Sequence, residues 1–273
     1  MSWIALRVTP AGSREAVLAA LFDVGSQGVH EEGDALVTHF PPETDVDAIR
    51  RTVAAVDPAA TIAVSETPVV DWSLWRANVA AHTLGRLTVT PPWLASESDP
   101  ATTIVIDPAM AFGTGEHATT RGVLRLMQQV VRDGDTVADL GAGSAVLSIA
   151  AVKLGASRVA AIELDPDATA NAQENIERND VASRIRFIEG DAAVLLPLVA
   201  PVRVVLANIV SSVLVVLLPE IAAALTTDGQ AILSGLLHEE RDWMLAQLAT
   251  HGWTVEAEDV EDEWWSVLIS RSA

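Results

Sequence analysis

The chain has 273 residues, of which half are hydrophobic, 20% are charged and none is cysteine. This length favours one large or two unequal domains, and the composition excludes global disorder, a disulfide framework, a thiol nucleophile and thiolate metal sites. The formal net charge of −20 disfavours direct nucleic-acid binding, because an acidic surface repels phosphates, and such a surface would instead attract a basic partner.

Residues 1–66 predict a small α/β unit. An alternating strand near the start is followed by an amphipathic helix that Gly25 closes, and then by a hairpin that straddles Gly33. A second helix begins after Thr44 or Asp45 as its cap, and another strand follows it. The order strand, helix, strand, strand, helix, strand is that of the ferredoxin-like fold, which hosts many unrelated functions.

Residues 67–100 predict a bridge between two domains. A short helix carrying Trp72 and Trp75 precedes the strand "GRLTVT", and Pro91 and Pro92 interrupt the chain after it. Aromatic side chains in such a bridge more often pack against a neighbouring domain than bind a ligand.

From residue 101 to residue 273, apolar strands alternate with helices. This pattern predicts a parallel sheet covered on both faces, with an antiparallel pair of strands at its end. The N-terminus has no basic region followed by a long apolar run, and the densest apolar stretch, residues 203–225, is interrupted by polar residues and Pro219. We therefore expect a soluble, cytoplasmic protein without a membrane span.

Two glycine-rich segments lie close together in this second region. The first, "DPAMAFGTGEHATT", covers residues 107–120, and the second, "DLGAGSAVL", places Gly141 and Gly143 where a strand should turn into a helix. Ligands of open α/β sheets lie beyond the carboxyl ends of the strands, so the two segments indicate one ligand held from both sides. A dinucleotide is disfavoured, because its fingerprint needs a small residue where this chain has Val146.

Acidic residues follow the next two strands. Glu163, 22 residues after Gly141, can accept hydrogen bonds from both hydroxyls of a ribose. Its alternative role as a helix cap suits Asp165, which precedes Pro166, better. Asp191 is a weaker candidate for the amino group of an adenine, and it would serve equally as a plain turn acid. A glycine turn and a ribose acid without pyrophosphate packing point to S-adenosylmethionine.

Several segments together resemble one known family. They are "DPAMAFGTGEHATT", "VADLGAGSAVLSIAAVKLGA", "IELDPDATANAQENIERN", "VVLANIV" and "GQAILSGLL". These segments resemble the bacterial methyltransferases that modify ribosomal protein eleven of the large subunit. The resemblance implies an α/β fold, in which a small ferredoxin-like α+β domain for substrate recognition precedes a Rossmann-like class I methyltransferase domain with a mostly parallel seven-stranded sheet.

The resemblance also implies the reaction and its partners. The enzyme would transfer methyl groups from S-adenosyl-L-methionine to lysine side-chain and N-terminal amines of a basic ribosomal protein. The acidic net charge, the interrupted apolar runs and the lack of metal-ligand spacing among the histidines separately predict no direct binding of nucleic acid, membrane or metal. In the family, the residues at Thr120, Gly141, Glu163 and Asn208 contact the cofactor. The full set of candidate cofactor contacts is Phe112, Thr120, Gly141, Gly143, Glu163, Asp191 and Asn208.

Three side chains have two interpretations each. Asn208 is the candidate for orienting the amine, because its side-chain oxygen accepts a hydrogen bond without adding charge, but it would also suit capping of the helix that begins near Ser211. Phe112 is a candidate lid over the methionine end of the cofactor, although an isolated phenylalanine is more often a core residue. His117 reads as a hydrogen-bond donor that holds its loop, with a role as catalytic base the weaker alternative.

This sequence departs from the family pattern at several positions. Ala142 and Ala145 stand where the glycine turn usually has cysteine and a last glycine, Glu116 replaces a frequent threonine, and Glu163 replaces aspartate. The methyl of Ala145 and the longer Glu163 would both affect cofactor affinity. Two alternatives therefore remain, a methyltransferase of the same fold with another acceptor and a non-catalytic binding module. A nucleic-acid base is a disfavoured acceptor, because no aromatic residue follows Asn208.

Overall fold

The computed structural model describes residues 2–26, 28–68, 79–96, 98–107, 113 and 115–272. The chain divides into two compact units, residues 1–78 and 79–273. The expected bridge helix with Trp72 and Trp75, and the candidate lid Phe112, lie outside the described residues. Within those residues, no helix has the length and apolar character needed to cross a membrane.

The first unit has the ferredoxin-like order that its sequence predicts. Its elements are β1 (Ser2–Thr9), α1 (Arg14–Asp23), β2 (Val29–Glu32), β3 (Ala35–Phe40), α2 (Val46–Val56) and β4 (Thr61–Pro68). The four strands form one antiparallel sheet in the order β2-β3-β1-β4. Asp45 rather than Thr44 caps α2, since its carboxylate accepts hydrogen bonds from the backbone of Asp47 and Ala48.

The core of the first unit follows from the alternation of its strands. Leu6 and Val8 of β1 are fully buried, because residues two apart point to the same face of a strand. They pack with Leu36 of β3 and with residues of both helices, including Leu21 and Ile49. The small unit therefore has its own hydrophobic core.

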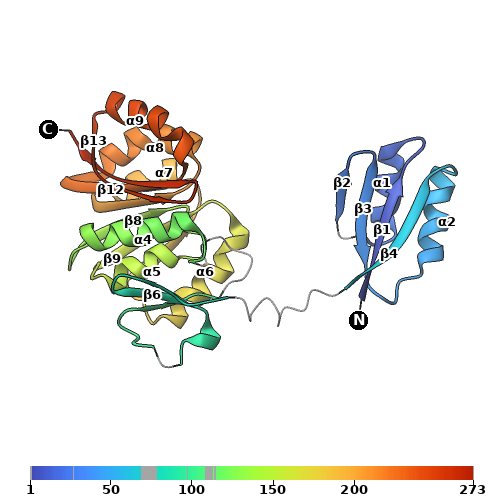
Figure 1. The fold of residues 1–273 in the computed structure, drawn as a ribbon, viewed down its shortest axis with the longest axis horizontal. Helices are drawn as coiled ribbons and strands as arrows, with labels where there is room; N and C mark the ends of the chain where they lie inside the picture. The colour runs from blue at the N-terminus through green and yellow to red at the C-terminus, as the bar shows by residue number, and fades with distance from the viewer. Residues whose placement is uncertain are drawn as a thin grey trace. The chain divides into compact units, whose positions relative to one another are not determined.

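The second unit is built around a seven-stranded sheet. Its elements are β5 (His82–Leu84), β6 (Leu87–Thr90), η1 (Pro92–Leu94), β7 (Thr103–Val105), α4 (Ala118–Val130), β8 (Thr136–Leu140), α5 (Val146–Lys153), β9 (Arg158–Glu163), α6 (Pro166–Arg178), β10 (Ile185–Glu189), α7 (Ala192–Val199), β11 (Val202–Asn208), α8 (Ser211–Ala224), β12 (Leu225–Leu237), η2 (His238–Glu240), α9 (Arg241–Thr250), β13 (Trp253–Glu261) and β14 (Trp264–Arg271) (Figure 1). The strand order of the large sheet is β10-β9-β8-β11-β12-β14-β13, and β5, β6 and β7 form a separate small sheet. Within the large sheet, the pairings of β14 are antiparallel and the others are parallel, as expected.

Helices cover both faces of the large sheet. On one face, Val137 of β8 and Leu206 of β11 pack with residues of α4, α5 and α6. On the other face, their sequence neighbours Ala138 and Ala207 pack with residues of α7, α8 and α9. Strands buried on both sides read as continuous apolar runs, and this is why the sequence indicated a parallel sheet. The arrangement is the predicted Rossmann-like fold with a mostly parallel seven-stranded sheet.

Candidate functional site

Three of the predicted site residues lie at one edge of the sheet. Gly141 follows β8, Glu163 ends β9 and Asn208 ends β11. Because β8 lies between β9 and β11 and pairs with both in parallel, the carboxyl ends of these strands meet at the same edge. This edge is where open α/β sheets bind their ligands.

The turn after β8 needs glycine at its first position. Gly141 has a φ of +71°, and a Cβ atom there would lie 2.5 Å from Cγ2 of Ile209. Its backbone N–H donates to the carbonyl of Ile162 on the neighbouring strand, at 2.9 Å. A side chain at position 141 would therefore strain the backbone and displace the loop that carries Asn208.

Ala145 ends this turn in the left-handed region, with a φ of 65°, directly before α5. A left-handed conformation costs a residue with a Cβ atom about 1–2 kcal/mol. The methyl group of Ala145 is fully buried in the hydrophobic cluster formed with α4, α5 and α6. The effect of Ala145 on cofactor affinity stays a prediction.

Glu163 accepts two backbone hydrogen bonds around the turn. Oε2 accepts from the N–H of Gly143 at 2.8 Å, and Oε1 accepts from the N–H of Asp165 at 2.9 Å. Each carboxylate oxygen has more than one lone pair, so both can also accept from ribose hydroxyls. Asp165 itself caps α6 by accepting from the N–H of Asp167, as its sequence position predicts.

The two glycine-rich segments are in direct contact. The hydroxyl of Ser144 donates to the carbonyl of Gly113 at 2.7 Å. Asn175, a fully buried residue of α6, joins the same two segments, because its amide donates to the carbonyl of Ser144 and its oxygen accepts from the N–H of Asp107. The structure thus brings the two segments together, as the idea of one shared ligand requires.

His117 begins α4 and holds its first turn. Its Nδ1 lies 3.4 Å from the backbone nitrogen of Thr119, whose N–H donates to it, and 2.8 Å from the hydroxyl of the same residue. Burial and the nearby charge of Arg121 lower the pKa of His117, and the carboxylate of Glu263 partly offsets this. The ring also contacts Trp264 edge to face, at 4.8 Å between centroids. His117 therefore holds its loop as predicted, with Nδ1 accepting from the backbone N–H of Thr119.

Thr120 and Asn208 meet across the site although they are 88 residues apart in the sequence. Asn208 Nδ2 donates to the hydroxyl of the fully buried Thr120 at 3.5 Å. Asn208 Oδ1 is buried and accepts no hydrogen bond from the part of the chain that the structure describes. Val210, not Asn208, is the residue that precedes α8, and it makes no side-chain cap. The capping alternative for Asn208 is therefore wrong.

Asp191 lies at the start of α7, where its carboxylate accepts from the N–H of Ala193 at 2.9 Å. This is the role of a plain turn acid that its sequence position allowed. A contact between Asp191 and the adenine of a cofactor stays a prediction.

Asp139, at the end of β8, is a candidate that the sequence interpretation missed. The side chain is completely buried, and Oδ2 accepts from the hydroxyl of Ser148 at 2.7 Å. Burial raises the pKa of Asp139 to about 7, the hydrogen bonds from Ser148 lower it, and the negative charge of Glu163 raises it. Oδ1 finds no hydrogen-bond partner among the described residues. An acid two residues before Gly141, at the end of a buried strand, was the signal available in the sequence.

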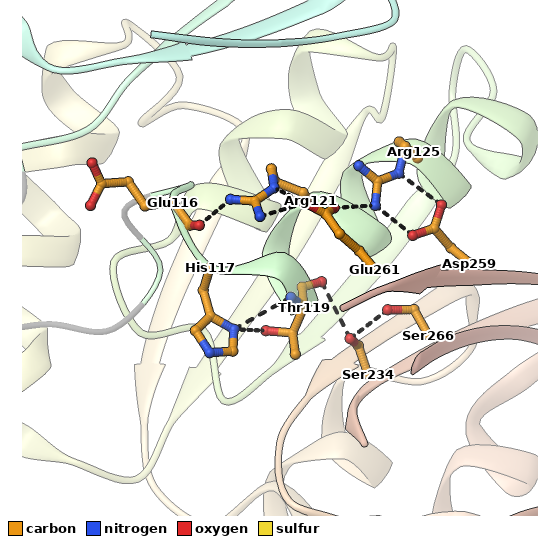
Figure 2. Close-up of polar contacts among 9 residues, drawn as sticks. All are labelled: Glu116, His117, Thr119, Arg121, Arg125, Ser234, Asp259, Glu261 and Ser266. Atoms are coloured by element: carbon orange, nitrogen blue, oxygen red, sulfur yellow. Dashed lines mark hydrogen bonds and ion pairs between the residues drawn. The ribbon is translucent and has the colours of Figure 1, made fainter. Parts of the chain in front are cut away.

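A cluster of ion pairs attaches α4 to β13 (Figure 2). Arg121 Nε donates to Glu261 Oε1 at 2.8 Å, and Arg125 donates to both Asp259 and Glu261. The Nη1 atom of Arg121 donates to the backbone carbonyl of Glu116, which lies in the first glycine-rich segment. No sequence motif marks these pairs, because 134 to 140 residues separate the partners.

The described side chains fit S-adenosylmethionine. Asp139 Oδ1 and Asn208 Oδ1 are buried acceptors without partners within the described ranges, and both oxygens of Glu163 can accept further hydrogen bonds. Such a set suits the ammonium and hydroxyl donors of a charged nucleoside, because a buried acceptor left without a donor costs about 1–3 kcal/mol. A Cβ atom at Gly141 would occupy the space between the turn after β8 and Ile209.

The chain is similar to known proteins along most of its length. A profile of the family described as Ribosomal protein L11 methyltransferase (PrmA) matches residues 20–272. The chain is 32% identical to the ribosomal protein L11 methyltransferase of Pelotomaculum thermopropionicum over 100% of both chains, and 33% identical to that of a Synechococcus species over 99% of this chain and 98% of the relative. The crystal structure of ribosomal protein L11 methylase from Lactobacillus delbrueckii subsp. bulgaricus is similar, with a TM-score of 0.64 and 28% identity, over 71% of this chain and 100% of the other.

Proposed function

This chain belongs to the ribosomal protein L11 methyltransferase family, and from that membership we propose that it methylates lysine side-chain and N-terminal amines of ribosomal protein L11 with S-adenosylmethionine as donor. The family membership supports the methyl donor and the protein acceptor. The choice of lysine side-chain and N-terminal amines is our own proposal and follows from the resemblance to this family.

The reaction does not require a side chain of the protein to act as a dedicated base. When bound, S-adenosylmethionine supplies a methyl group on a sulfonium, so that a new N–C bond forms on the amine as the S–C bond breaks. The amine must first release a proton to water, and its ordinary pKa is about 10.4. A buried site beside a positive charge lowers that pKa, so a dedicated base is not needed. The protein mainly has to align the reacting atoms and exclude water.

Asn208 is the residue that supports our proposal for how the amine that accepts the methyl group is oriented. Its Oδ1 is a buried acceptor without a partner in the described residues, and its Nδ2 is held by Thr120. A neutral amine has N–H donors that this oxygen can accept, and the resulting hydrogen bond would direct the nitrogen lone pair toward the methyl group. We assign Asn208 to orient the amine, and we assign Thr120, Gly141, Gly143 and Glu163 to hold the cofactor.

The first unit is our candidate for substrate recognition. Residues 1–66 contain a ferredoxin-like fold with its own core, and they are not part of the seven-stranded sheet. The net charge of −20 favours a basic substrate, since opposite charges speed encounter between proteins. A cytoplasmic location fits this substrate and a cysteine-free chain.

The first experiment is calorimetric titration of the purified protein with S-adenosylmethionine, followed by mass spectrometry of ribosomal protein L11 after incubation with both. We expect binding in the micromolar range and a mass increase in whole methyl groups, with the modified amines located by peptide mapping. Asn208→Ala should lower kcat by about 100-fold, in the range of a lost positioning contact. A folded parent that binds no cofactor would instead support a non-catalytic module, and a parent that binds but leaves L11 unmodified would support another acceptor.

A further inference from the structure

The last strands of the chain support the first glycine-rich segment of the site. Helix α4 begins within this segment and lies against β13 and β14 (Figure 2). The contact is close at Gly122, where a Cβ atom would lie 2.5 Å from the hydroxyl oxygen of Ser266. One turn earlier, Ser234 of β12 donates to the carbonyl of Thr119 and shares a hydrogen bond with Ser266. The start of α4 is therefore fixed by strands more than 100 residues later in the sequence.

Arg121 extends this support from the helix to the loop before it. Figure 2 shows its guanidinium between the carbonyl of Glu116 on one side and the carboxylate of Glu261 on the other. Its side chain is only 17% exposed. A planar guanidinium presents several donors in a fixed fork, so one side chain can bind a carbonyl and a carboxylate at the same time in one geometry.

The loop that Arg121 holds is the one that approaches the cofactor turn. Glu116 lies between Gly115 and the helix-capping His117, and Gly113, two residues earlier than Gly115, accepts the hydrogen bond of Ser144 in the turn. Thr120, which contacts Asn208, directly precedes Arg121. Displacement of the Glu116 carbonyl would therefore disturb both the contact of Gly113 with Ser144 and the contact of Thr120 with Asn208.

We propose that Arg121, itself held by Glu261, is a positioning residue that sets Gly113 and residues 115–117 against the cofactor turn and so determines the affinity for S-adenosylmethionine. Arg121 acts through the backbone of Glu116 and does not touch the cofactor. This inference rests on the proposed function, because it concerns the affinity of the same site.

The chain supplies a matched control in Arg125. This residue lies one turn further along α4, binds the same Glu261 and also binds Asp259. Its side chain is 32% exposed, and within the described residues it donates to Asp259 and Glu261 of β13 and not to the loop. Loss of Arg125 therefore weakens the attachment of α4 to β13 and leaves the contact between Arg121 and Glu116 in place.

The test compares Arg121→Ala with Arg125→Ala in the full-length protein. For each variant we would measure the Kd of S-adenosylmethionine by calorimetry and the melting temperature. We would also measure kcat and the KM for S-adenosylmethionine, with ribosomal protein L11 as the acceptor. We expect Arg121→Ala to raise the Kd and the KM for the cofactor by about tenfold, with kcat changed less, because a charge-assisted hydrogen bond to the loop is lost. Arg125→Ala should lower the melting temperature and leave the Kd within about twofold of the parent.

Two more conservative variants, Glu261→Gln and Arg121→Lys, provide the test if Arg121→Ala does not fold. Glu261→Gln keeps an oxygen that accepts from Arg121, so the Kd should rise less than in Arg121→Lys, where one ammonium cannot serve both partners. Equal Kd values for the parent and the Arg121 variants would overturn the proposal and leave the proposed function intact. An equal rise in Kd for Arg125→Ala would also overturn it, because the ion pairs would then act only on helix packing. A parent without cofactor binding would overturn the proposed function itself.

Discussion

The hydroxyl of Ser144 donates a hydrogen bond of 2.7 Å to the carbonyl of Gly113, a residue 31 positions earlier in the chain. Both residues are buried, and each belongs to one of the two glycine-rich segments. This contact fixes the distance between the segments before any ligand is considered. A site that depends on two loops is thereby organised by one side chain that does not need to touch the cofactor.

Ser144→Ala should weaken both the fold and the site. The carbonyl of Gly113 would lose its buried donor, and this costs about 1–3 kcal/mol in the free energy of unfolding. The control is Ser157→Ala, because the exposed Ser157 also donates to a glycine carbonyl, that of Gly134, before the start of β8. Denaturant unfolding would measure the free energy of unfolding of both variants. Calorimetric titration should show a raised Kd for S-adenosylmethionine in Ser144→Ala alone. Equal Kd values in both variants would contradict the role of Ser144.

Gly141→Ala should lower the affinity for the cofactor. The new methyl group would meet Ile209 at 2.5 Å, and the backbone would keep a φ of +71° that alanine tolerates poorly. Gly134→Ala is the matched control, because Gly134 has a φ of +89° with nothing within 4 Å of a Cβ atom. Both variants should lose about 1–2 kcal/mol of stability from the backbone strain. Only Gly141→Ala should raise the Kd measured by calorimetry.

Ala145 should tolerate glycine and reject valine. In Ala145→Gly, relief of the left-handed conformation, about 1–2 kcal/mol, is offset by loss of a buried methyl group, about 0.8 kcal/mol, and by the greater chain entropy of glycine, about 0.5–1 kcal/mol. The free energy of unfolding should therefore change by less than about 1 kcal/mol. Ala145→Val combines a branched side chain at positive φ with overpacking of a fully buried position, so it should cost at least about 2 kcal/mol. The measurement is the urea midpoint of unfolding of the parent, Ala145→Gly and Ala145→Val. A valine variant as stable as the parent would contradict the prediction.

The stability of the protein should depend on pH through Asp139. Its folded pKa is about 7, against an ordinary value of 3.8, so the folded protein keeps a proton that the unfolded chain releases. The free energy of unfolding should consequently fall as the pH rises from about 4 to about 7, and then level off. Asp139→Asn removes this titration and should flatten the curve in that window. The measurement is urea unfolding at several pH values, and an equal slope in both proteins would exclude Asp139 as the source.

The fold could be predicted because its signals are local. Alternation along β1 and continuous apolar runs in β8 and β11 indicate which faces are buried, and Asp165 before Pro166 marks the start of a helix. Gly141 and Glu163 could be paired because Gly141 follows one strand and Glu163 ends the next, and parallel strands end at one edge.

The remaining parts of the site depend on contacts between distant residues. Arg121 and Glu261 are 140 residues apart, and neither has a neighbour in the sequence that identifies its partner. Asp139 is marked in the sequence only by its place near the end of an apolar strand, and its complete burial depends on the helices that cover that strand. For the same reason, the sequence allowed Asn208 both capping and orientation, and the position of Val210 before α8 excludes the first.

The dependence of α4 on β13 and β14 has a consequence for synthesis of the protein. A ribosome makes the glycine-rich segments and α4 first, and residues 253–271, which hold α4 in place, come more than 120 residues later. At about 5–20 residues per second, this leaves an interval of roughly 6–25 seconds in which the nascent chain has its binding loops but not their support. We therefore expect fragments from translation that stops early to bind the methyl donor more weakly than the full chain, which gains its full affinity only with the closing hairpin.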